Sequence, residues 1–173
     1  FLDGHPTPAT PCVPLATGAS GVGLAAACGM ALGALDLFGR GAPRIHVVEG
    51  EAGLTPGRVS EALAAASVAG LSNLVVHVDF NQSSIDSDRV CRQGRHRGDY
   101  VPWTPAELFR LHDFNLVEVD EGLDPWKILS AQGLARKNHN DRPTAIIYRT
   151  TKGWRYGIEG RASHGAGHDC CSE

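Results

Sequence analysis

The sequence has few of the features that would tie it to nucleic acid or to a membrane. Its 16 basic residues are balanced by 19 acidic ones, so the formal net charge is only −3. No apolar run approaches the roughly 18–20 residues of a membrane span, and no signal peptide is recognisable. A chain with this charge balance offers no strongly basic surface. We therefore expect neither nucleic acid nor a membrane among its partners.

Cysteine is also sparse, and aromatic residues make up only 6% of the chain. The number of cysteines is odd, and their spacing is not that of a disulfide framework: they are Cys12, Cys28, Cys91, Cys170 and Cys171. Such a pattern is typical of reduced cysteines, which predicts a cytoplasmic protein. The first residue is not methionine, so we expect a fragment or a processed piece of a longer protein.

Hydrophobic residues make up 42% of the chain, enough for a core, and 173 residues are about the length of one domain. We expect a single domain over residues 1–173, with a loop-rich tail over residues 153–173. Four prolines within residues 1–16 predict an extended N-terminal loop. The polar, arginine-rich segment 83–102 predicts an exposed loop.

Short apolar strands alternate with helices along the rest of the chain. Helices are expected over residues 21–38, 58–69 and 125–137, with another beginning after Thr104, and strands over residues 45–48, 74–78, 115–119 and 144–148. The first helix is apolar nearly all round, which predicts that it is buried. Thr104, Pro105 and Glu107 have the pattern of a helix cap. The alternation predicts an α/β fold with a mainly parallel sheet and helices on both faces.

The stretch from Ile45 to Asp86 brings oxygen ligands to one edge of that sheet. It runs strand, acidic glycine-rich turn, helix, strand and loop, the order of a crossover between parallel strands. Glu51 and Asn81 each follow the carboxyl end of a strand, where open α/β sheets bind ligands. Such oxygens suit a hard cation such as Mg²⁺. An acidic surface turn at Glu51 and an Asx turn at Asn81 are the structural alternatives.

This stretch resembles the diphosphate-binding domain of thiamine diphosphate enzymes, and the transketolase family most closely. That family carries Gly-Asp-Gly, a helix with Glu-Ala, a strand with Asn-Leu, then Asp-x-Asn and Ile-Asp. The matching residues, without gaps, are Gly50–Ala52, Glu61–Ala62, Asn73–Leu74, Asp79–Asn81 and Ile85–Asp86. The family's Gly-His-Pro, Thr-Pro-x-Val and Thr-Gly-Pro-Leu-Gly-Gln-Gly motifs are matched by Gly4–Pro6, Thr10–Val13 and Thr17–Gly23. The resemblance implies the thiamine diphosphate-binding fold, in a chain truncated relative to the whole enzyme.

The resemblance also implies roles for single residues. The cofactor-binding residues are Gly18, Ala19, Ser20, Gly50, Ala52 and Asn81; the first three open a helix, whose N-terminus favours a phosphate. The implied ligands of Mg²⁺ or Ca²⁺ are Glu51, Asn81 and the carbonyl of Ser83. Catalytic roles are implied for His5 at the thiazolium, for His164 over the diphosphate, and for Glu61 in an acid network between two active sites. Ordinary surface residues are the alternative at each of these three positions.

Three positions depart from the family motifs. Glu51 replaces an aspartate, and Ala52 replaces a glycine, which costs energy if that position needs a positive φ. Pro56 replaces a glutamate of the acid network and carries neither charge nor proton. These departures favour, as an alternative, a degenerate relative that scaffolds or regulates. A short-chain dehydrogenase is a weaker alternative, because the glycine turn and the Tyr148-x-x-x-Lys152 spacing resemble that family.

The implied activity is the transfer of a two-carbon ketol unit between sugar phosphates, with thiamine diphosphate and a divalent metal. A separate pyrimidine-binding domain or subunit would supply the glutamate that activates the cofactor's aminopyrimidine ring, so we expect this chain alone to be inactive. We also expect a homo- or hetero-oligomer, and exposed apolar surface where a large dimer would cover this domain. The donor and acceptor sugars stay open.

Overall fold

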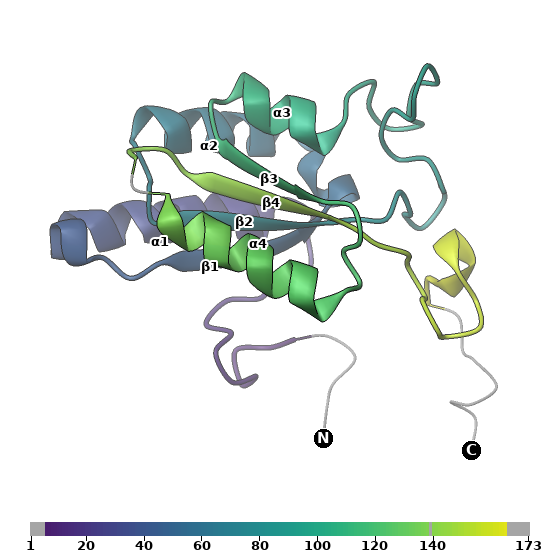
Figure 1. Ribbon diagram of the computed structural model, residues 1–173, viewed down its shortest axis with the longest axis horizontal. Coiled ribbons are helices and arrows are strands. Elements are labelled where there is room, and N and C mark those ends of the chain that lie inside the picture. Colours follow the sequence, from purple (N-terminus) through teal and green to yellow (C-terminus); the bar gives the residue numbers. More distant parts are fainter. Residues whose placement is uncertain (1–5, 139, 166–173) are drawn as a thin grey trace.

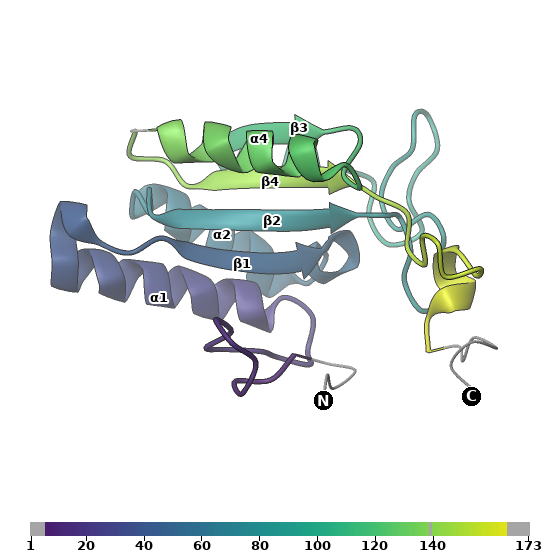
Figure 2. The same ribbon diagram turned by 60° about the horizontal axis from the view of Figure 1, so that its bottom comes forward.

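The computed structural model describes residues 6–138 and 140–165, and its centre is a four-stranded sheet (Figure 1). The strands are β1 (Ile45–Gly50), β2 (Leu74–Phe80), β3 (Asn115–Val119) and β4 (Thr144–Arg149), in the order β1-β2-β4-β3. All three pairings are parallel. The predicted α/β fold is confirmed, and all strands end at the same edge (Figure 2).

Helices cover both faces of this sheet, as predicted. They are α1 (Val22–Phe38), α2 (Gly57–Val68), α3 (Pro105–Leu111) and α4 (Pro125–Lys137). Side chains of α1, α2 and α3 share one core cluster with alternate residues of β2 and β4, such as Val76 and Ile147. The intervening residues, such as Val75 and Ile146, pack with α4 on the other face. The central strands β2 and β4 have helices on both sides of the sheet and are almost continuously apolar.

The start of α3 is capped as the sequence predicts. The Thr104 hydroxyl accepts the Glu107 N–H, and the Glu107 carboxylate accepts the Thr104 N–H at 2.8 Å, which is a complete capping box. We expect Thr104→Ala to lower the free energy of unfolding by about 1 kcal/mol, because it leaves a helix N–H without an acceptor. Urea denaturation checks this value, with Thr151→Ala in an exposed turn as the control. Equal losses in both variants would contradict the capping role.

The expectation of a helix buried all round is wrong for α1. Its buried residues lie along one side, at Leu24, Ala27, Cys28, Ala31 and Ala34, whereas Leu37 and Phe38 are 78% and 60% exposed. The prediction that no apolar stretch approaches the length of a membrane span also needs correction. Among the described residues, Val22–Gly41 is long and apolar enough to cross a membrane, by length and composition alone. A core helix passes the same test, and here one side of the segment packs into the core.

The expected exposed apolar surface is confirmed on the α4 face of the sheet. Trp126 and Leu129 of α4 are 77% and 58% exposed, and Val48 of the edge strand β1 is 76% exposed. The helix α4 packs on β3 and β4, so part of this face is open over β1 and β2. A parallel sheet normally has helices across both faces.

A row of hydrogen-bonded rings crosses this open part of the sheet. His46 Nδ1 lies 2.8 Å from His77 Nε2, and His77 Nδ1 lies 2.9 Å from the Tyr148 hydroxyl. Burial, together with the neighbouring His46, lowers the pKa of His77 to about 4, so this imidazole is neutral at pH 7. The row lines a groove of about 590 Å³ between β1 and α4. Its hydrogen bonds satisfy polar groups on an otherwise apolar sheet face.

Candidate functional site

The two predicted ligand turns meet at the carboxyl edge of the sheet. Gly50 and Asp79 are register partners at the ends of β1 and β2, so Glu51 and the Asn81 loop follow directly from paired strands. The Glu51 carboxylate accepts the backbone N–H of Asn81 at 3.2 Å. The structure thus brings Glu51 and Asn81 together, in the place where open parallel sheets bind ligands.

Glu51 is buried in a short 3₁₀ helix (Glu51–Leu54) rather than exposed in a surface turn. Its side chain is 1% exposed, and Oε1 has no hydrogen-bond partner among the described residues. Burial raises the pKa of this carboxyl group to about 7, against the backbone N–H groups that lower it, and the Asp79 charge raises it further. A buried carboxylate oxygen without a partner is costly. A cation at Oε1 would satisfy it, so this donor fits a metal.

Asn81 forms the Asx turn that was the structural alternative. Its Oδ1 accepts the Ser83 N–H at 2.8 Å, and its Nδ2 donates to Asp79 at 3.0 Å. An amide oxygen has a second lone pair, so this turn leaves one acceptor position on Oδ1. No three His, Cys, Asp or Glu side chains cluster as a metal site within the described ranges. A metal here would therefore be held by Glu51 together with amide, carbonyl and ligand oxygens.

The loop after β2 is anchored by buried residues, which corrects the expectation of an exposed loop over 83–102. Val90 and Cys91 are completely buried, and Gln82 exchanges two hydrogen bonds with the backbone of Cys91, at 3.2 and 2.8 Å. Gln82 also has a left-handed backbone, with φ of 65°. A non-glycine residue takes this conformation only where its surroundings enforce it. These contacts fix the chain that carries Asn81 and Ser83.

The glycine turn before α1 lies at the same edge (Figure 2). Gly18, Ala19 and Ser20 are all exposed, so their backbone is accessible from solvent. Gly21, with φ of 76°, is the N-cap of α1 and packs against the start of α2. Ala52 is not among the described residues with a positive φ, so the cost considered for replacing glycine there does not arise. The predicted cofactor-binding backbone segments are thus close to the Glu51 turn.

One lysine, Lys152, follows β4 at this edge and is not among the residues predicted for the site. Lys152 Nζ lies 2.6 Å from Nδ1 of the exposed His164. Arg161, near His164 in the chain, donates its backbone N–H to Asp88 at 2.6 Å, which ties this segment to the loop after β2. The sequence signal that could have identified Lys152 is its place in the Thr150–Gly153 segment, directly after β4. His5, predicted to be catalytic, lies outside the described residues.

The remaining predicted residues are placed on and beside α2. Glu61 is exposed on α2, consistent with either a solvent-facing or an interface role. Pro56 is the N-cap of α2 and packs near Gly21. Of the loop arginines, Arg89 and Arg92 form ion pairs with Asp99 and Glu107. These pairings engage two of the loop arginines with acidic side chains of the same chain.

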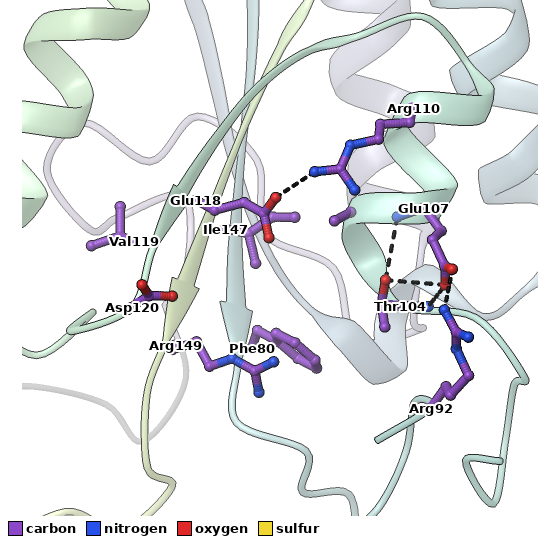
Figure 3. Close-up of a pocket in the computed structure, with 11 residues that line it drawn as sticks. Phe80, Arg92, Thr104, Glu107, Arg110, Glu118, Val119, Asp120, Ile147 and Arg149 are labelled. Carbon is purple, nitrogen blue, oxygen red and sulfur yellow. Dashed lines mark hydrogen bonds and ion pairs between the residues drawn. The ribbon is translucent and has the colours of Figure 1, made fainter. Parts of the chain in front are cut away.

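A pocket beside α3 contains none of the predicted site residues (Figure 3). Its volume is about 260 Å³, and several of its charged side chains are paired with one another. Arg110 contacts Glu118, Arg92 contacts Glu107, and Arg149 lies 4.3 Å from the centre of the Phe80 ring. Side chains engaged in this way satisfy each other, so we place the candidate site at the carboxyl edge instead.

The dehydrogenase alternative finds no support in the structure. Tyr148 lies in β4 and Lys152 in the turn after it, so the two do not share a helix face. The glycine turn before α1 follows a loop, not the strand that a dinucleotide fingerprint requires.

An open parallel α/β sheet with a buried acid, an Asx loop and a helix N-terminus at its carboxyl edge belongs to the class of cofactor-binding α/β domains. The chain itself belongs to the transketolase family: residues 2–169 match the family described as "Transketolase, thiamine diphosphate binding domain". The recognition made from the motifs is therefore confirmed.

Similar proteins agree with this assignment. Human transketolase is 36% identical over 152 residues, and "Transketolase-like protein 2" of Bos taurus is 38% identical over 156 residues. Each match covers 88% of this chain but only 22% or 23% of the relative. The crystal structure of transketolase from Campylobacter jejuni superposes with a TM-score of 0.75 at 28% identity, over 94% of this chain and 24% of that one. The chain thus spans about a quarter or less of these relatives.

Proposed function

We propose that residues 1–173 form the diphosphate-binding domain of a transketolase-like transferase, with residues 153–173 as a loop-rich tail. The observation that carries this proposal is the buried Glu51 carboxylate, with its unpartnered Oε1, next to the Asn81 loop at the carboxyl edge. The family match supports thiamine diphosphate as the cofactor. One relative was solved in complex with sedoheptulose-7-phosphate, which supports a sugar phosphate as the substrate.

In this proposal, Glu51, the Asn81 amide oxygen and the Ser83 carbonyl hold Mg²⁺ or Ca²⁺. Mg²⁺ prefers a few protein oxygens together with phosphate oxygens and water. Gly18, Ala19 and Ser20 bind the diphosphate through backbone N–H groups at the start of α1. Lys152, beside His164, contributes positive charge for the diphosphate.

The bound cofactor would supply the carbon chemistry of ketol transfer, and the residues of this chain orient it and manage charge. In this proposal His5 and His164 are assigned to the substrate side of the cofactor, and Glu61 to an acid network that leads to a second active site. The chain requires a pyrimidine-binding domain or subunit, in a homo- or hetero-oligomer, and is inactive alone. Cys12, Cys28 and Cys91 are free thiols in the structure, which supports a cytoplasmic location.

Isothermal titration of thiamine diphosphate into the chain, with and without Mg²⁺, tests the proposal. We expect Mg²⁺-dependent binding that weakens at least tenfold in Glu51→Ala and in Asn81→Ala, because each removes a metal ligand. Glu118→Ala and Asn140→Ala, which remove the same groups from exposed positions elsewhere, are the matched controls. Absence of binding even after addition of a transketolase pyrimidine-binding domain would contradict the proposal.

That negative result would favour the second candidate, a degenerate relative that scaffolds or regulates. The observation that favours it is Pro56, which caps α2 where the family motif has an acid. Saturable binding that depends on Glu51 would exclude this second candidate as far as cofactor binding is concerned.

A further inference from the structure

Glu49 is an acidic residue of the carboxyl edge that neither the motifs nor the proposed function uses. It is the penultimate residue of β1 and only half-buried. Its Oε2 accepts the N–H of Gly21 at 3.2 Å, and its Oε1 accepts the N–H of Gly50 at 3.2 Å. Gly21 adjoins the proposed diphosphate turn, and Gly50 belongs to the proposed cofactor-binding set. We call the proposed diphosphate-binding backbone, residues 18–20 with Gly50 and Ala52, the diphosphate cradle. The Glu49 carboxylate therefore accepts one N–H beside this cradle and one within it.

The packing around this carboxylate is specific. A Cβ on Gly53 would lie 2.0 Å from Glu49 Oε1 and 2.3 Å from its carboxyl carbon, so the absence of a side chain at Gly53 makes room for the carboxylate. The N-cap of α1 is Gly21, which has no side chain to cap the helix, and the first turn of α1 contains no acid. Glu49 takes the position of a helix cap from 28 residues away in sequence.

The acidic side chains around the cradle affect how strongly a diphosphate can bind there. Glu49 and Glu51 lie on either side of Gly50, and the Asp79 charge acts on Glu51 as well. A diphosphate carries several negative charges and needs N–H donors, and here the Glu49 carboxylate already accepts the N–H of Gly50 and that of Gly21 beside the proposed diphosphate turn. Like charges at short range inside a protein repel strongly. The unpartnered Oε1 of Glu51 is a second, independent sign that this cradle is built around a ligand.

We propose that Glu49 is a built-in competitor of the diphosphate: its carboxylate occupies the helix N-terminus and the Gly50 N–H, and it sets a reduced affinity for diphosphate ligands. This inference rests on the proposed cofactor site. Removing the charge at Glu49 lowers the repulsion, and removing its acceptor oxygens frees these donors, so diphosphate ligands bind more tightly to such variants than to the natural chain.

Two variants of the full chain test this proposal, each titrated calorimetrically with thiamine diphosphate plus Mg²⁺ and, separately, with inorganic pyrophosphate without Mg²⁺. Glu49→Gln keeps the shape and one carbonyl acceptor, whereas Glu49→Leu removes all polar atoms. We expect affinity to rise by about tenfold in both variants. Asp36→Asn is the matched control. Asp36 is exposed near the C-terminal end of α1, so this substitution removes the same charge far from the proposed site.

The outcomes separate this inference from the function on which it rests. Binding of thiamine diphosphate to the natural chain with equal affinity in Glu49→Gln would overturn the inference alone. Tighter pyrophosphate binding in the Glu49 variants would uphold the inference, and if no variant bound thiamine diphosphate even after addition of a transketolase pyrimidine-binding domain, the function would be overturned. Binding of neither ligand by any variant, with the pyrimidine-binding domain present as well, would overturn both. Glu49→Gln keeps the test valid if Glu49→Leu does not fold.

Discussion

Replacing Gly21 by alanine is expected to lower the free energy of unfolding by about 3 kcal/mol. The backbone of Gly21 has φ of 76°, which costs an alanine about 1–2 kcal/mol. The added Cβ would also lie 2.5 Å from Val59 Cγ2 and 3.0 Å from the Gly53 carbonyl oxygen, so α1 and the start of α2 must separate. Urea denaturation followed by circular dichroism measures the loss.

The control is Gly29→Ala in the same helix. A Cβ on Gly29 meets nothing within 4 Å, and its φ is not positive. Because alanine favours a helix over glycine by up to about 1 kcal/mol, this variant is expected to gain stability. Equal effects of the two substitutions would show that the contact between α1 and α2 is not what requires glycine at position 21.

Glu51 is expected to make the metal-free chain less stable as the pH rises from about 4.5 to about 7. Burial raises the pKa of Glu51 from 4.5 to about 7, so the folded state binds a proton that the unfolded state has already released in this range. Stability falls wherever the folded state binds more protons. At 1.36 kcal/mol per pKa unit, the difference amounts to about 3 kcal/mol of stability, present below pH 4.5 and lost by pH 7.

Comparison with Glu51→Gln isolates this contribution, because other groups titrate alike in both proteins. The difference in unfolding free energy between the two is expected to change by about 3 kcal/mol between pH 4.5 and 7.5. The stability of the natural chain falls relative to that of Glu51→Gln over this range. Glu118→Gln, at an exposed position, is expected to show no such change. Parallel pH profiles for Glu51→Gln and the natural chain would mean that Glu51 is not a buried acid.

Elements with local signals were predictable from the sequence. The strand β3 and the helix α4 have the bounds expected for them, because turns, Pro125 and the acidic cap Asp124 mark their ends locally. The strands β1 and β2 extend two residues beyond prediction, to Gly50 and Phe80. Pairing between strands determines those ends, and pairing is not a local property.

The candidate site was predictable only where a motif names its residues. Composition could not show that α1 has an exposed side, because that depends on what packs against it. Nor could it place Glu49 at the N-terminus of α1 or Lys152 beside His164, since both contacts join segments distant in sequence. Glu51 and Asn81 were paired correctly because parallel strands carry their following turns to one edge.

The parallel register has a consequence for how this site tolerates change over evolution. Because Gly50 pairs with Asp79, the spacing between the Glu51 turn and the Asn81 loop is inherited from the hydrogen-bond ladder of the sheet, not from either loop. Single substitutions such as aspartate to glutamate can therefore accumulate here while the neighbouring backbone keeps its place. An insertion between Gly50 and Glu51 would instead separate the two ligands at once. We therefore expect related chains to differ at this site in their side chains, and to keep the same number of residues between the strands and the two ligands.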